Sequence, residues 1–168
     1  MSVGGRVARA ERAGPPAERA GPPAGRAGPA AARVVQADGR AKAYRPLPAA
    51  RRAAALEEGL LAYERGDFFL AHEHLEPAWM GTPDPAERAF IQGLIKLAAA
   101  DVHGVRGNAL GVARNLDGAL VRLRQASDGG LTAPDGSRLD LLIDALERRV
   151  ANARRGAPTR PTVLPWRA

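Results

Sequence analysis

Apolar residues recur every three to four positions in five segments between Ala49 and Arg155, and glycine or proline separates these segments. This spacing places the apolar side chains of each segment on one face of a helix. No segment alternates polar and apolar residues in the way that a half-buried strand does. We therefore predict an all-α fold, a compact bundle of about five helices in which short loops make neighbouring helices antiparallel.

Residues that favour helix ends mark the boundaries of these segments. Gly66 is suited to end the first helix, because glycine adopts a positive φ angle without strain. Asp67, Asp84 and Asn108 are suited to cap the next three helices, since their side chains accept hydrogen bonds from backbone amides of the first turn. We expect helices over residues 49–65, 68–80, 85–103, 109–124 and 138–155.

The two ends of the chain differ in composition from the helical part. ERAGPPA occurs at residues 11–17 and again at 18–24, within a region dominated by Gly, Pro, Ala and Arg. Such a region buries too little apolar surface to offset the entropy lost on ordering. We predict a disordered N-terminal arm over residues 1–45, a helical domain over 48–155 and an irregular basic tail over 156–168.

The formal net charge of +7 is unevenly distributed. Residues 1–52 hold 11 basic and 3 acidic residues, and residues 148–168 hold six arginines and no acid, whereas residues 53–147 hold 8 basic and 15 acidic residues. A nucleic-acid-binding domain carries its positive charge on the folded surface. Contact of the basic arm with RNA or DNA is therefore the less favoured interpretation, and a solvated arm is the favoured one.

Composition also excludes several classes of protein. The chain has no cysteine, which excludes disulfides, thiolate nucleophiles and thiolate zinc sites. No apolar run approaches the roughly 18 to 20 residues of a membrane helix. The N-terminus lacks the hydrophobic segment of a secretory signal. We therefore expect a cytoplasmic protein without membrane contact.

The candidate site lies in the second predicted helix. At about 100° per residue, His72, Glu76 and Trp79 fall within a narrow arc of the apolar face. A buried carboxylate is costly unless it is paired, hydrogen-bonded or metal-bound, and local design rules fail mostly at functional sites. We predict His72 and Glu76 as catalytic or metal-ligating residues, with Glu73 at the edge of the arc and Trp79 as a wall of the pocket.

Polar residues of the third predicted helix extend this candidate pocket. Gln92 and Lys96 fall level with His72 and Glu76 if the second and third helices pack antiparallel. His103 lies on the same side of the third helix, but about 15 Å beyond the level of His72. We therefore expect Gln92 and Lys96 to line the pocket, with His103 at its edge and too distant to share one ion with His72.

Three interpretations of the His72–Glu76 pair stay open. Imidazole and carboxylate four residues apart can bind a divalent transition metal such as zinc, manganese or iron. Alternatively, the carboxylate orients the imidazole for metal-free acid–base chemistry. In the third interpretation the pair is structural, and Gln92, Lys96 or Arg88 satisfies Glu76. A homo-oligomer is a further alternative, in which the helices of two copies complete one site.

Two stretches, GDFFLAHEHLEPAW and FIQGLIKLAAADVHGVRGN, closely resemble a small all-helical family catalogued as domain of unknown function 309. The resemblance covers about residues 53–123. It implies an all-helical fold and, because members have been labelled predicted metal-dependent hydrolases, a metal-dependent hydrolytic activity with no named substrate. The residues that match are His72, Glu73, Glu76, Trp79, Gln92, Gly93, His103, Gly107 and Asn108.

A second resemblance is to the helical hairpin of a tetratricopeptide repeat. Small and large residues at its characteristic positions include Gly59, Asp67, Ala71, Leu75 and Pro83. The chain has only a faint second copy, whereas a stable array needs about three repeats. The resemblance therefore predicts hairpin geometry, and it supports an alternative function as a non-enzymatic scaffold or peptide-binding module.

Overall fold

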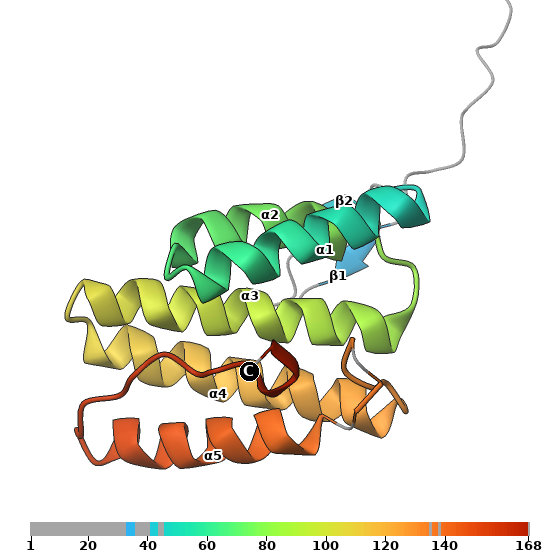
Figure 1. Ribbon diagram of the computed structural model, residues 1–168. Helices are drawn as coiled ribbons and strands as arrows, with labels where there is room; N and C mark the ends of the chain where they lie inside the picture. The colour runs from blue at the N-terminus through green and yellow to red at the C-terminus, as the bar shows by residue number, and fades with distance from the viewer. Residues whose placement is uncertain (1–32, 36–40, 44–45, 135, 138, 168) are drawn as a thin grey trace, which may run out of the picture. The chain divides into compact units, whose positions relative to one another are not determined.

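The computed structural model describes residues 33–35, 41–43, 46–134, 136–137 and 139–167, all within one unit, Ala31–Ala168. The predicted all-α fold of five helices is confirmed. Its elements are α1 (Ala49–Glu64), α2 (Phe68–Gly81), α3 (Pro85–Val105), α4 (Ala109–Asp128), α5 (Asp140–Arg154) and a short 3-10 helix, η1 (Pro165–Arg167) (Figure 1).

The helix ends follow the capping chemistry of the sequence. The side chains of Asp67, Asp84 and Asn108 each accept a hydrogen bond from the backbone amide three residues further on. Gly66 adopts a φ angle of 80° between α1 and α2, a conformation that glycine adopts without strain. These residues fix where α2, α3 and α4 begin.

Each helix packs against the next one in the chain, α1 on α2, α2 on α3, α3 on α4 and α4 on α5 (Figure 1). The α1–α2 pair forms the hairpin that the sequence predicted. Among the described elements, α2 makes its most extensive contacts with α1 and α3, and Phe69 on its remaining surface is 61% exposed.

Helices α3 and α4 approach each other closely at glycines. A Cβ atom at Gly93 would lie 2.9 Å from Leu123 Cγ, and one at Gly129 would lie 2.7 Å from Ala86 Cβ. Both separations are shorter than van der Waals contact, so these positions exclude a larger side chain. The contacts also fix an antiparallel register, in which the start of α3 lies beside the end of α4.

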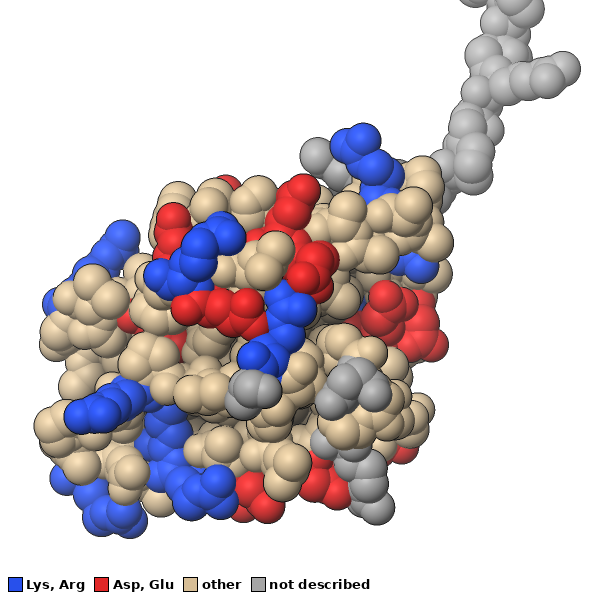
Figure 2. Space-filling view, viewed as in Figure 1, with Lys and Arg blue, Asp and Glu red and all other residues tan. Residues whose placement is uncertain are grey.

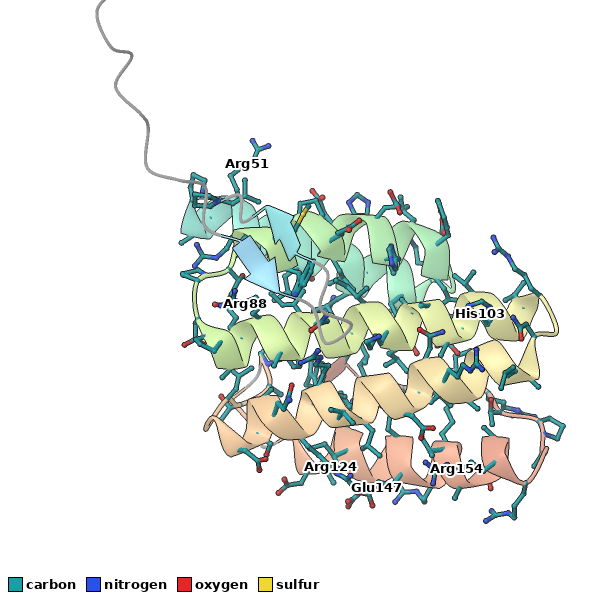
Figure 3. All side chains as sticks on the ribbon, turned by 180° about the vertical axis from the view of Figure 1, so that it is seen from behind. Arg51, Arg88, His103, Arg124, Glu147 and Arg154 are labelled. Carbon is teal, nitrogen blue, oxygen red and sulfur yellow. The ribbon has the colours of Figure 1, made fainter. Side chains whose placement is uncertain are left out.

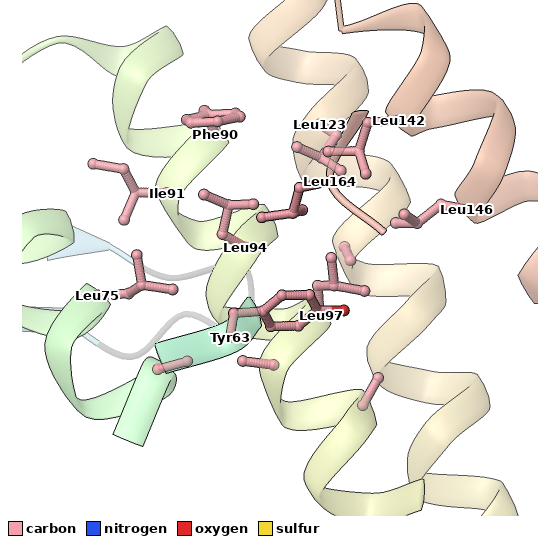
Figure 4. Close-up of a cluster of buried hydrophobic side chains, with 14 of the residues drawn as sticks. Tyr63, Leu75, Phe90, Ile91, Leu94, Leu97, Leu123, Leu142, Leu146 and Leu164 are labelled. Atoms are coloured by element: carbon pink, nitrogen blue, oxygen red, sulfur yellow. The ribbon is translucent and has the colours of Figure 1, made fainter. Parts of the chain in front are cut away.

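Leucine and other aliphatic side chains from all five helices form one continuous core. Figure 4 shows its centre, where side chains from α3 meet those from α2, α4 and α5. The most deeply buried large residues are Leu75, Ile91, Leu97, Leu116, Leu123, Leu139, Leu142 and Leu146.

Two three-residue strands precede the helices, β1 (Arg33–Val35) and β2 (Ala41–Ala43), and they pair antiparallel. The hydrophobic pattern does not indicate them, because three residues are too few to show an alternation. The intervening sequence contains Asp38-Gly39, which is typical of a hairpin turn. The rest of the predicted arm, residues 1–32, 36–40 and 44–45, lies outside the described residues.

The segment after α5 returns across the helices. Thr162 and Leu164 are buried, and the ring centroid of Trp166 lies 5.9 Å from that of Phe90 on α3. Apart from η1, the described part of this segment has irregular backbone. Among the described residues, no helix is both long and apolar enough to cross a membrane.

Candidate functional site

His72, Glu73 and Glu76 form a compact group of potential metal ligands on α2. One ligand atom from each of the three side chains lies within 4.8 Å of the others. His72 Nδ1 is 3.4 Å from Glu73 Oε1. The spacing explains the convergence, because residues four and three apart lie on the same side of a helix. Glu76 therefore lies one turn beyond both His72 and Glu73.

This group lies at the rim of the buried face of α2. The His72 and Glu73 side chains are 35% and 53% exposed, and Glu76 is half-buried rather than buried. Successive helical residues point about 100° apart. The complete burial of Leu75 in the core therefore turns Glu76 toward the solvent edge. The three side chains are open to water on one side.

The second histidine of this helix has a different neighbour. His74 Nδ1 lies 3.3 Å from Glu58 Oε2 of α1, and the His74 side chain is 34% exposed. His74 is not a member of the group formed by His72, Glu73 and Glu76. It provides a matched control for experiments on His72.

Two of the predicted pocket residues on α3 pack against α4. A Cβ atom at Gly118 would lie 2.8 Å from Lys96 Cδ, and one at Gly111 would lie 2.5 Å from the His103 ring. His103 Nδ1 also lies 3.2 Å from Asn108 Nδ2 at the turn into α4. In Figure 3, His103 lies near the C-terminal end of α3 and Arg88 lies near its N-terminal end. These contacts assign Lys96 and His103 to the α3–α4 interface.

Trp79 and Gln92 line a pocket together with residues that the sequence did not assign to a pocket. This pocket has a volume of about 600 Å³ and lies where the end of α2, the start of α3 and the end of α4 meet. Its polar lining includes Arg88, Arg122 and Gln125. The four-residue spacing of Arg88 and Gln92 was visible in the sequence, but only the α3–α4 register brings Arg122 beside them.

A buried polar network joins α1, α3, α5 and the C-terminal segment. Asp101 is 2% exposed, and its carboxylate accepts hydrogen bonds from Tyr63 Oη at 2.6 Å and from Arg149. Arg149 also donates to Thr162 Oγ1 at 3.2 Å, and the Thr162 amide donates to Tyr63 Oη at 3.2 Å. Hydrogen bonds thus link the four residues in the interior, and Arg149 takes part through its two terminal nitrogens.

Burial raises the pKa of the Tyr63 hydroxyl well above its ordinary value, and the nearby Asp101 carboxylate raises it further. The phenol therefore stays protonated and donates to Asp101. A sequence signal for this network existed, because Asp101 follows Leu94, Leu97 and Ala98 on the apolar stripe of α3. The criterion that selected Glu76, a carboxylate on the apolar face of a helix, applies equally to Asp101.

Residues 56–115 match the family described as Domain of unknown function (DUF309). This match confirms the resemblance that the sequence indicated, and it extends from the second half of α1 into α4. No curated protein and no solved structure matches the chain. The matched segment contains His72, Glu73 and Glu76, but Arg122 and Arg149 lie beyond it.

Proposed function

We propose that the segment matching this family of unknown function binds a divalent transition metal through His72, Glu73 and Glu76, and that the protein is a metal-dependent hydrolase. The observation that carries the proposal is the convergence of one nitrogen and two oxygen ligands within 4.8 Å on a single helix. Imidazole and carboxylate together suit zinc, manganese and iron.

The geometry of the group supports this assignment. Two ligand atoms bound to zinc at tetrahedral positions lie about 3.4 Å apart, and His72 Nδ1 and Glu73 Oε1 are separated by 3.4 Å. Small rotations of the Glu73 and Glu76 side chains, which are exposed and half-buried, would bring all three ligand atoms to bonding distance. Their attachment to one rigid helix limits the entropy lost on binding.

The exposure of the group suits a catalytic rather than a purely structural ion. Three protein ligands leave a further coordination position for water, as in known catalytic zinc sites. A bound divalent ion lowers the pKa of its water and supplies a hydroxide nucleophile near neutral pH. The part played by His72, Glu73 and Glu76 is to hold the ion at the solvent edge of α2.

The metal proposal is tested on full-length protein purified without an affinity tag. We expect zinc or manganese to bind with one ion per chain and to raise the melting temperature, since an ion at about 100 times its Kd adds roughly 2.7 kcal/mol of stability. His72→Ala and Glu76→Gln should each weaken binding by at least about tenfold. His74→Ala is the matched control and should bind as the unmodified protein does.

The proposal fails if no transition metal copurifies and added zinc or manganese leaves the melting temperature unchanged. Hydrolysis is assayed in a separate experiment with chromogenic phosphate esters and carboxylic esters, with and without a chelator. Metal-dependent turnover that is lost in His72→Ala supports a hydrolase. Metal binding without turnover would contradict the hydrolytic part alone, and absence of both would favour the α1–α2 hairpin as a scaffold.

A further inference from the structure

The pocket between α3 and α4 carries two arginines that no carboxylate pairs with among the described residues. Arg88 Nη2 donates to the backbone oxygen of Pro83 at 3.0 Å, and Arg122 Nη1 donates to Gln125 Oε1 at 2.8 Å. Both acceptors are neutral, so neither of these two hydrogen bonds offsets the charge of the guanidinium. Each contact uses one of the five N–H donors of an arginine and fixes the direction of the side chain.

The α3–α4 register explains why these charges meet in one cavity. Ala86 lies against Gly129, and Lys96 lies against Gly118. In the antiparallel pair this register brings Gln92 level with Arg122, and Arg88 lies one turn before Gln92 on α3. Both arginines are half-buried, and both line the pocket of about 600 Å³. Figure 3 shows Arg88 near the start of α3.

The remaining lining residues define the kind of ligand. Small residues, Ala86, Ala89 and Gly129, leave the cavity open, and the buried indole of Trp79 supplies an apolar wall. Among the described lining residues, Asp84 carries a carboxylate. Its Oδ1 accepts a hydrogen bond from the backbone amide of Glu87 at 2.7 Å. The amide side chains of Gln92 and Gln125 add neutral hydrogen-bonding groups.

We propose that this pocket is a binding site for a small phosphate monoester, with Arg88 and Arg122 holding the phosphate and Trp79 contacting the organic part. Two arginines from different helices match a dianion better than the single charge of a carboxylate, and a guanidinium can bind two phosphate oxygens at once. A volume of about 600 Å³ lies within the usual range of small-molecule sites. The proposal does not rest on metal binding at His72, Glu73 and Glu76.

The test uses phenylphosphonate, which presents a phosphonate and a planar ring and is not hydrolysed at its C–P bond. Calorimetric titration of the full-length protein in the presence of a chelator should show saturable binding of one molecule per chain. Arg88→Gln and Arg122→Gln should each weaken binding by roughly 10- to 100-fold, the usual effect of losing a hydrogen bond to a charged group. The double variant should not bind.

Two controls separate this site from other basic parts of the chain. Arg114→Gln removes an exposed arginine of α4 outside the pocket and should leave the Kd unchanged. Benzoate should bind more weakly than phenylphosphonate. The proposal is overturned if phenylphosphonate binding survives in the double variant, if Arg114→Gln weakens it as much as Arg122→Gln, or if no binding occurs up to about 1 mM.

Discussion

Asp101 is the residue whose environment most constrains the interior. A buried carboxylate loses its hydration, and this loss must be offset by charge and hydrogen bonds inside the protein. Here Arg149 supplies the charge, and Tyr63 supplies a second hydrogen bond. Removing one partner alone leaves an unsatisfied group in the core, so each of these residues depends on the others.

The raised pKa of Tyr63 predicts a loss of stability at alkaline pH. Above the ordinary tyrosine pKa of about 10 the unfolded chain releases the phenolic proton, whereas the folded protein retains it. The contribution of Tyr63 to the free energy of unfolding should therefore be independent of pH below about pH 10. Above it, the free energy of unfolding should fall by up to about 1.4 kcal/mol for each pH unit. Chemical denaturation at several pH values measures this slope.

Tyr63→Phe should reduce the alkaline slope while lowering stability at neutral pH, because hydrogen bonds to Asp101 and Thr162 are lost. A Tyr44→Phe variant leaves Tyr63 as the one tyrosine of the chain. Its tyrosinate absorbance should then appear together with unfolding. Ionisation of Tyr63 in a fully folded protein near pH 10 would contradict this account.

At the scale of helices, glycine permits the closest approaches. A Cβ atom at Gly59 of α1 would lie 2.6 Å from Cγ of Leu75, which is buried at the centre of α2. At Gly118 of α4 the nearest atoms belong instead to the flexible side chain of Lys96. The two glycines therefore differ in what a methyl group would displace.

This contrast predicts opposite effects of the same substitution. Gly59→Ala gains about 1 kcal/mol of helix propensity but overpacks the core at a cost of about 1–3 kcal/mol, so the protein should become less stable. Gly118→Ala keeps the propensity gain, because Lys96 is half-exposed and can move. Thermal unfolding of both variants provides the measurement, and equal shifts of melting temperature would refute the packing argument.

At the scale of the molecule, the basic C-terminal region complements the acidic helices. Arg154 pairs with Asp117 at 2.8 Å, and Arg167 pairs with Glu57 at 2.8 Å and contacts Glu64. Figure 2 shows basic side chains gathered where α5 ends and acidic side chains around α1. Part of the charge separation seen along the sequence is therefore neutralised within the folded protein.

Deletion of residues 157–168 should destabilise the whole protein. It removes the contacts of Thr162 with Arg149 and Tyr63, and it exposes core surface that Leu164 and Trp166 cover. Burial of one large apolar side chain contributes about 1.5–3 kcal/mol, so we expect a loss of at least about 3 kcal/mol. Circular dichroism during heating measures the change.

The matched control for this deletion is Arg160→Gln, which removes an exposed charge from the same segment and should leave the melting temperature unchanged. A truncated protein as stable as the full chain would contradict a structural role for the C-terminal segment. The segment lies outside the family match over residues 56–115. The effect of the deletion therefore also shows whether the stability of the matched region depends on the rest of the chain.

Local sequence patterns were sufficient to predict the helices, their caps and the proximity of His72 to Glu76, with Glu73 at the edge of the same arc. All of these features depend on residues within four positions of one another, where helical geometry fixes the distances. The sequence also pointed to Trp79 and Gln92, which do share a pocket.

Contacts between side chains that are distant in the sequence could be seen only in the folded protein. The α3–α4 register joins Arg88 to Arg122, and the returning C-terminal segment joins Thr162 to Tyr63 and Arg149. The folded structure also places Glu76 at the solvent-exposed rim of α2 rather than in the core. The physical reason is that helical periodicity specifies a face but not its neighbour, which is set by core packing and by glycine contacts between helices.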